Sequence, residues 1–219
     1  MLPVFVFIGG AVAWAYSQVK RAPANQPILT TLKNSVSSTG ALFGPFQPYG
    51  PQMPVNKNKL SATELLNLIG QIEGKGNYNI VFGGKTPPLT SMSIKEVYAY
   101  QDAMRKSGLR STAVGKYQFI QKTLKEVVAD LKYPETQIFT AQVQDTLALD
   151  LLNARGFQNY LNGKLSEASF LKNLAMEWAS IPKDSSNKSY YAGDGLNKAL
   201  VDYKIVLAAM RNAKTTYTA

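Results

Sequence analysis

Hydrophobic and polar positions divide the chain into three parts. Residues 1–21 are almost entirely apolar, whereas residues 22–58 hold six of the 11 prolines among Ser, Gly, Asn and Thr. Prolines at this density exclude regular helix and sheet and favour an extended spacer. From residue 59 onward the apolar positions recur at helical spacing. We therefore expect an N-terminal hydrophobic helix over 1–21, a proline-rich linker over 22–58 and a folded domain over 59–219.

The folded part carries repeated helix signals. Residues 61–64 and 93–96 both have the Ser-x-x-Glu capping-box pattern, and Gly74 and Gly108 are placed to end the helices that follow. Further helices are expected at about 119–131, 139–155, 166–180 and 196–213. The segment 78–82 has extended character and would form at most one short β element. The sequence predicts a mainly α-helical domain.

The apolar run over residues 2–16 contains no charge and is followed by Lys20 and Arg21. As a helix it would span about 22 Å, and extension to Val19 brings it near the lower limit for crossing a membrane. We expect a retained membrane anchor. A secretory signal and a soluble apolar arm are the alternatives, but a signal has its basic residues before the apolar run rather than after it.

Composition excludes several kinds of chemistry. The chain has no Cys and no His, so disulfides, Cys/His zinc sites, Cys nucleophiles and His-based triads are absent. Acid and base roles fall to Asp, Glu, Lys or Tyr, and no metal or cofactor is expected. The net charge of +10 favours an anionic partner such as a lipid surface or cell-wall polymer. The basic residues are scattered and no nucleic-acid module is present, so we expect no nucleic-acid partner.

Glu73 is the first candidate for catalysis. It follows an apolar helix face and precedes Gly74, so its carboxyl lies at the negative end of the helix dipole. That position, with partial burial, would raise its pKa and suit a general acid at neutral pH. The alternative is an ordinary surface Glu at a frayed helix end.

Two further segments contain aromatic and amide side chains that suit a sugar ligand. Residues 111–119 combine small residues with Tyr117 and Gln118, and residues 177–182 contain Glu177 and Trp178. The candidate substrate-binding residues are Tyr78, Tyr117, Gln118, Trp178, Tyr190 and Tyr191. The alternatives are a buried tyrosine, a core tryptophan and an exposed helical Glu.

The order and spacing of these segments resemble the lambda-phage-type lysozymes, the lytic transglycosylase branch of the lysozyme-like superfamily. The matching segments are GQIEG at 70–74, NYNIVFGG at 77–84, STAVGKYQF at 111–119 and WASIP at 178–182. The resemblance extends over residues 61–196 and covers none of residues 1–58. The segment between 84 and 111 departs from the lambda enzyme and looks more like phage virion-associated relatives.

The resemblance implies a lysozyme-like fold and cleavage of peptidoglycan between N-acetylmuramic acid and N-acetylglucosamine. The Glu at the position of Glu73 is the sole acid/base of that family, and the product is a 1,6-anhydro sugar. Ordinary glycosidases need two carboxylates. Glu177, or less readily Asp102, would be the second carboxylate of a hydrolytic muramidase, which is one alternative. A non-catalytic peptidoglycan-binding structural virion protein is another.

The combination of an apolar N-terminal segment, a linker and a lytic domain in one chain predicts where the enzyme acts. We expect a membrane-associated component of a phage virion, anchored through residues 1–21, that opens the bacterial cell wall during entry. Residues 22–58 would contact other virion proteins, because Phe43, Phe46 and Tyr49 are too aromatic for a purely solvated tether. A free endolysin needs neither part.

Overall fold

The computed structural model describes residues 57–195 and 197–218. The predicted hydrophobic helix over 1–21 and nearly all of the predicted linker lie outside these residues. The elements, in chain order, are α2 (Lys57–Gly74), the 3-10 turn η2 (Leu89–Ser91), α3 (Ile94–Lys106), α4 (Gln121–Asp130), α5 (Ala141–Ala154), α6 (Phe157–Leu161), α7 (Glu167–Glu177) and α8 (Tyr203–Thr218). The described part of the chain is mainly α-helical, as the apolar spacing predicts.

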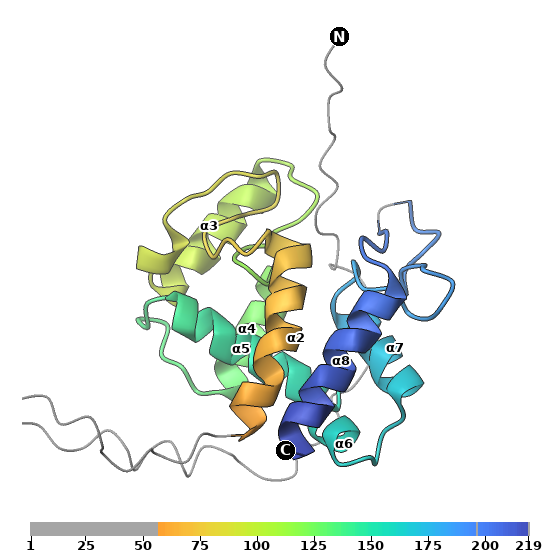
Figure 1. Ribbon diagram of the computed structural model, residues 1–219. Coiled ribbons are helices and arrows are strands. Elements are labelled where there is room, and N and C mark those ends of the chain that lie inside the picture. The colour runs from red at the N-terminus through yellow and green to blue at the C-terminus, as the bar shows by residue number, and fades with distance from the viewer. Residues whose placement is uncertain (1–56, 196, 219) are drawn as a thin grey trace, which may run out of the picture.

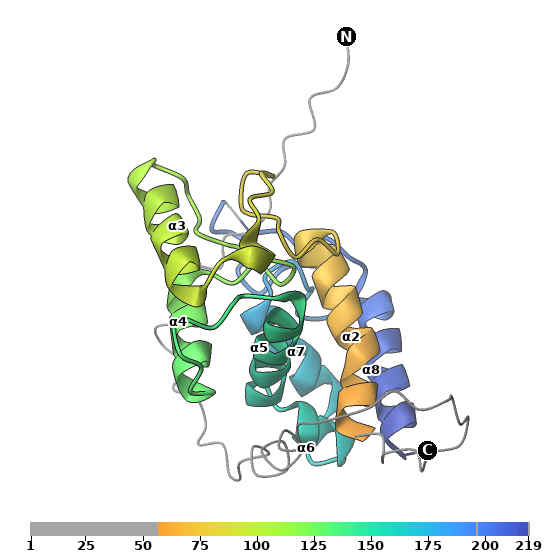
Figure 2. The ribbon, with the colours of Figure 1, turned by 90° about the vertical axis from the view of Figure 1, so that its left-hand side faces the viewer.

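Two antiparallel helices, α2 and α8, run side by side in both ribbon views (Figure 1, Figure 2). On one side of α2 lie α3 and α4, and on the other α6 and α7 pack against α8 (Figure 1). The central helix is α5, which packs against α2, α4 and α6. The largest fully buried side chains are Phe119, Phe139, Phe157, Phe170, Leu65, Ile69, Leu89, Ile94, Leu124, Leu147, Leu151 and Leu152. This core fixes the C-terminal end of α2, where Glu73 lies.

The helix starts differ in how well the sequence predicts them. At Ser93 the capping box is confirmed: its hydroxyl accepts from the Glu96 N–H, and the Glu96 carboxylate accepts from the Ser93 N–H at 2.7 Å. The equivalent pattern at 61–64 was wrong as a helix start, because α2 already begins at Lys57. Ser61 is instead buried inside the helix. The Ser-x-x-Glu pattern therefore does not distinguish a helix start from a buried serine inside a helix.

Two later helices have different bounds from those predicted. Helix α7 ends at Glu177 rather than at residue 180, because Trp178 takes an extended conformation (φ −115°, ψ 103°). Helix α8 begins at Tyr203 rather than at residue 196, and the Asp202 carboxylate accepts from the Lys204 N–H at 2.8 Å at its start. The short helix α6 was not predicted at all. The extended segment 78–82 forms only an isolated bridge, between Val81 and Val114.

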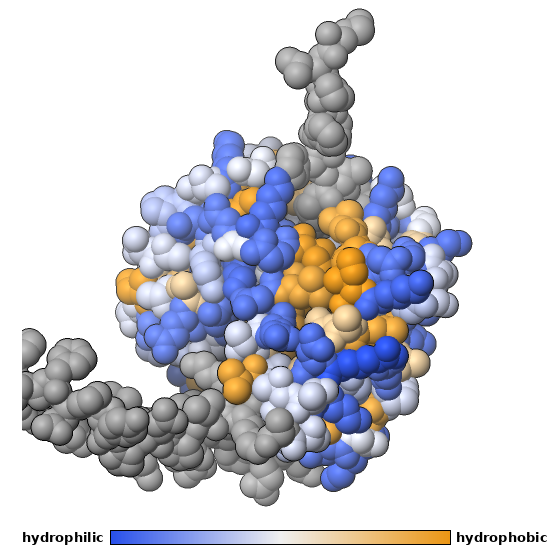
Figure 3. Space-filling model, in the orientation of Figure 1, coloured by the Kyte–Doolittle hydropathy of each residue, from blue (hydrophilic) through white to orange (hydrophobic). Residues whose placement is uncertain are grey.

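A continuous apolar area is visible on the face of the molecule seen in Figure 1. Figure 3 shows apolar side chains gathered near the adjoining ends of α2 and α8. Leu200, just before α8, and Ile205, in its first turn, are 57% and 52% exposed. Among the helices that the structure describes, none has the length and apolar character needed to cross a bilayer.

Candidate active site

Glu73 lies in the last turn of α2 and is partly buried. Its carboxylate oxygen Oε1 accepts a hydrogen bond from the hydroxyl of Ser180, which lies in the turn after α7. Burial raises the pKa of Glu73 from 4.5 to about 7, although the hydroxyl and backbone hydrogen bonds from Ser180 act in the opposite direction. At neutral pH this carboxyl is therefore poised between its two protonation states, as a general acid/base requires.

A small cavity adjoins the Glu73 carboxyl. Its lining residues are Glu73, Tyr117, Gln118, Phe119, Ile120, Thr123, Leu151, Glu177 and Trp178. The fold thus brings together the end of α2, the loop before α4 and the end of α7. These are the three segments that the sequence singles out, and five of the predicted site residues meet at one place.

The loop before α4 is held in a tight reversal. Val114 and Phe119 pair through both backbone hydrogen bonds, at 3.1 and 2.9 Å, and the Gly115 N–H donates to Ile80 O at 2.7 Å. Gln118, at the turn, has a positive φ of 50°, and its side-chain amide donates to Gly115 O at 2.8 Å. A left-handed conformation is uncommon for a residue with a side chain and is often found at functional sites. Here it places Gln118 on the wall of the Glu73 cavity.

Close packing of α2 against this loop depends on two glycines. A Cβ at Gly70 would come within 3.0 Å of the Lys116 side chain, and one at Gly74 would come within 3.0 Å of the Lys116 backbone. The two glycines lie one turn apart on α2. Because neither has a side chain, Lys116 packs directly against the helix. The next residue, Tyr117, therefore reaches the cavity beside Glu73.

A polar cluster holds the far side of this loop. The Tyr78 and Tyr117 hydroxyls donate to Asp145 Oδ1 at 2.9 and 2.6 Å, and Lys116 Nζ donates to the Tyr78 hydroxyl at 3.1 Å. Burial and the Asp145 carboxylate raise the pKa of Tyr78 to about 12 and that of Tyr117 well above its usual value. Both rings are therefore neutral hydrogen-bond donors. Because Tyr117 is 2% exposed, it forms a wall behind the site and no open stacking surface.

The candidate second carboxylate, Glu177, is buried and ion-paired. Arg155 Nε and Nη2 both lie 2.7 Å from Glu177 Oε2. Asp102, the weaker candidate, is paired with Arg105 at 2.7 Å and accepts from Gln121 at 2.9 Å. Asp102 is not among the residues that line the Glu73 cavity.

The remaining aromatic candidates lie around the end of α7. Trp178 is buried on the cavity wall. Tyr190 and Tyr191 meet edge to face with ring centroids 5.1 Å apart, and the Tyr191 hydroxyl donates to Met176 O at 2.7 Å. Tyr190 is 36% exposed, so its ring is open to a ligand, whereas Tyr191 links the loop to α7.

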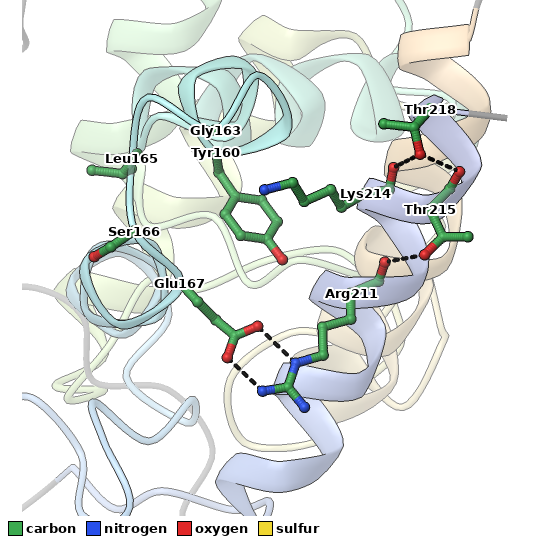
Figure 4. Close-up of a pocket in the computed structure, with 9 residues that line it drawn as sticks. All are labelled: Tyr160, Gly163, Leu165, Ser166, Glu167, Arg211, Lys214, Thr215 and Thr218. Carbon is green, nitrogen blue, oxygen red and sulfur yellow. Dashed lines mark hydrogen bonds and ion pairs between the residues drawn. The ribbon is translucent and has the colours of Figure 1, made fainter.

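A larger depression lies elsewhere, between the start of α7 and the C-terminal half of α8 (Figure 4). It has a volume of about 420 Å³, and Tyr160, Glu167, Arg211 and Lys214 line it. The Glu167–Arg211 pair bridges its two walls through hydrogen bonds of 2.7 Å. None of the predicted site residues lines this depression.

Three residues with clear roles in the site geometry were not predicted. Ser180 lies within the WASIP motif, and its position in that motif is the sole sequence signal that it belongs to the site. Arg155 and Asp145 lie on α5 and at its end, where the sequence offers no signal beyond helical spacing. Their partners are 22 and 28 residues away in the chain, so only the fold reveals the pairs.

Comparison with known proteins supports a relationship over this whole region. A family model described as Endolysin matches residues 58–204. A solved structure of bacteriophage lambda lysozyme complexed with a chitohexasaccharide is similar, with 18% sequence identity and a TM-score of 0.46, over 74% of this chain and 97% of that chain. No curated protein matches. Because the family model spans well over half of the chain, from the start of α2 to the start of α8, the chain belongs to the endolysin family of phage enzymes that degrade peptidoglycan.

Proposed function

We propose that the chain is a lytic transglycosylase that cleaves the β-1,4 bond between N-acetylmuramic acid and N-acetylglucosamine, with Glu73 as the single acid/base. The observation that carries this proposal is the environment of Glu73. Its pKa of about 7 suits both proton donation and proton uptake at neutral pH. Among the described residues that line its cavity, the only other carboxylate is Glu177, whose charge is compensated by Arg155.

In the first step, protonated Glu73 donates its proton to the glycosidic oxygen as the bond from C1 to that oxygen breaks. The N-acetylglucosamine end leaves as an alcohol, and positive charge develops at C1 of the muramoyl ring. In the second step the Glu73 carboxylate takes the proton of the muramoyl 6-hydroxyl, whose oxygen attacks C1. A 1,6-anhydro sugar forms, no water is consumed and Glu73 regains its proton.

The surroundings of Glu73 support both steps. The Ser180 hydroxyl occupies Oε1, which leaves Oε2 to carry the proton. Gln118, on the cavity wall, offers an amide for the hydroxyl or acetamido groups of the sugar. We place Tyr78, Tyr117, Trp178, Tyr190 and Tyr191 around the glycan as well. Tyr190 offers an exposed ring, and the buried Tyr117 and Trp178 line the wall of the Glu73 cavity.

The test is mass spectrometry of the muropeptides that the full chain releases from purified peptidoglycan. We expect products with 1,6-anhydro-muramoyl ends from the native chain and a loss of at least about 100-fold in Glu73→Gln, since the single proton donor is gone. Glu64→Gln, an exposed acid on the same helix, is the matched control and should retain full activity. Release of products by Glu73→Gln at the native rate would refute the assignment.

One observation favours a second mechanism. Glu177 lines the same cavity as Glu73, so a hydrolytic muramidase would have a second carboxylate at hand. The same experiment separates the two. Reducing muramoyl ends in place of anhydro ends would identify the hydrolase, and no release from the native chain would leave a non-catalytic peptidoglycan-binding protein.

We further propose that the enzyme is anchored to a membrane through residues 1–21 and is carried in the phage particle, where residues 22–58 contact other virion proteins. The uncharged run over 2–16 and the basic residues that follow it support an anchor. An anchored lytic domain would open the wall locally during entry. Mass spectrometry of purified particles tests this location, and the absence of the chain from them would refute it.

A further inference from the structure

We propose that Glu177 and Arg155 form a positioning pair, which fixes the turn after α7 so that the Ser180 hydroxyl stays on the catalytic carboxyl. This inference rests on the proposed role of Glu73. It gives Glu177 a function through Ser180 and no direct part in the reaction.

The pair has the properties of a structural ion pair. Arg155 Nε and Nη2 both lie 2.7 Å from the same carboxylate oxygen of Glu177, and the two side chains are 13% and 4% exposed. A buried charge without a partner is strongly destabilising, so each residue holds the other in place. A carboxylate engaged in this way is not available to activate water unless the pair opens.

The pair ties the end of α7 to the end of α5. Arg155 is the C-cap residue of α5, and its backbone carbonyl accepts from the Asn173 side-chain amide at 3.1 Å. The backbone and the side chain of Arg155 therefore hold two successive turns of α7, at Asn173 and at Glu177. On another side, the Tyr191 hydroxyl donates to Met176 O at 2.7 Å. The last turn of α7 is thus fixed by bonds from two other segments.

A short, hydrogen-bonded stretch connects Glu177 to Ser180. The Trp178 N–H completes α7 by donating to Leu174 O at 2.8 Å, and the Ile181 N–H donates back to Trp178 O at 3.0 Å. The carbonyl of Ser180 accepts from the Leu200 N–H at 2.8 Å. Ser180 therefore lies inside a closed turn, residues 178–181, that directly follows Glu177. Any movement of the helix end moves the hydroxyl relative to Glu73.

The test compares Ser180→Ala with a neutral pair variant, Arg155→Met/Glu177→Leu, and with the triple variant. Replacement of both charges avoids an unpaired Arg155 or Glu177, either of which would act on Glu73 directly. Tyr117, which lines the Glu73 cavity, and Tyr191, which interacts with Arg155, Glu177 and Tyr190, are unchanged in all of these variants. The readouts are kcat, KM and the pKa of Glu73 from a carboxyl ¹³C NMR titration of the full chain.

Ser180→Ala should raise the pKa of Glu73, because it removes a hydrogen bond that favours the carboxylate, and should lower kcat about tenfold. The neutral pair variant should show the same two changes with KM within about twofold of native. The triple variant should be no worse than Ser180→Ala, since both changes act through one contact. Effects that multiply in the triple variant would overturn the proposal, as would a native pKa and kcat in the neutral pair variant.

Two further variants keep the test decisive. Arg155→Lys retains both charges but loses the two-nitrogen contact, so it should show the same changes in weaker form if the neutral pair variant does not fold. Glu167→Gln removes an acid from the opposite end of α7, where it pairs with Arg211, and should leave kcat and the Glu73 pKa unchanged. A Glu73 pKa shift in Glu167→Gln equal to that in the neutral pair variant would overturn the specific role of Glu177.

The two proposals fail in different ways. If the native chain releases no muropeptides, the proposed function is wrong, but the NMR titration still reports whether the pair acts on Glu73 through Ser180. If the native chain releases reducing ends, and the neutral pair variant releases none while Ser180→Ala still does, Glu177 is a reacting base and the positioning role is wrong.

Discussion

The Glu73 carboxyl shows how a functional group can lower the stability of the fold that holds it. An isolated carboxyl titrates near 4.5, but burial at the end of α2 moves the pKa of Glu73 to about 7. Between these two values the folded chain holds a proton that the unfolded chain has released. Stability must therefore fall as the pH rises through this window, and above pH 7 the whole destabilisation is present.

Glu73→Gln should consequently be more stable than the native chain at alkaline pH. The amide is uncharged, and its oxygen still accepts from Ser180. The gain in the free energy of unfolding should be small at pH 4 and on the order of 3 kcal/mol at pH 8. Urea denaturation at both pH values measures it. A gain that is equal at the two pH values would contradict the pKa of Glu73.

Glu73 could be predicted from sequence because its signal is local: an acid between an apolar helix face and a glycine. Ser180 could not be assigned, because its partner lies 107 residues away and a serine in a turn has many possible roles. Glu177 was predicted to be exposed or catalytic, and the sequence held no information on Arg155 as its partner.

The C-terminal end of helix α2 depends on two positions that have no side chain, Gly70 and Gly74. Alanine is normally better than glycine in a helix by about 1 kcal/mol. At Gly70 and Gly74 this preference is reversed, because Lys116 occupies the space that a Cβ would need. The loop that carries Tyr117 and Gln118 can then approach the helix.

Gly74→Ala should destabilise the chain by roughly 2–3 kcal/mol, because its Cβ meets backbone that cannot move aside. Gly70→Ala meets only the Lys116 side chain. Its cost should vanish in the Lys116→Ala background, where alanine regains its helical advantage. Urea unfolding of the two single variants and of both combined with Lys116→Ala measures this difference. Rescue of Gly74→Ala by Lys116→Ala would show that the backbone contact is not the obstacle.

The helices themselves were largely predictable, because their apolar spacing reflects the core directly. The predicted end of α7 and the predicted start of α8 were wrong, because both depend on other parts of the fold. Trp178 leaves the helical conformation where it lines the Glu73 cavity, and residues 197–202 stay outside α8, where the Leu200 N–H donates to Ser180 O. Both departures lie at the site, where the chain follows the geometry of the site rather than its local propensity.

The positive charge of the chain as a whole is concentrated toward its N-terminal segment. Of the net charge of +10, the residues before the first acid, Glu64, supply +5. An apolar segment followed by basic residues should bind an anionic bilayer, and the charge contribution should weaken with salt.

The full chain should therefore float with vesicles of phosphatidylglycerol and phosphatidylcholine, and a chain that lacks residues 1–21 should remain at the bottom of the gradient. High salt should reduce the binding of the truncated chain to purified peptidoglycan far more than the flotation of the full chain, since apolar insertion is not screened. Equal flotation of both chains would refute the anchor.

The hydrogen bond between Ser180 and Glu73 also has a consequence for how the enzyme is made. It joins residues 107 positions apart, and α2, which carries the acid, packs along α8. During synthesis the Glu73 carboxyl emerges from the ribosome well before Ser180 and α8. Until both have emerged, a ribosome-bound chain therefore holds its acid without the surroundings that raise its pKa.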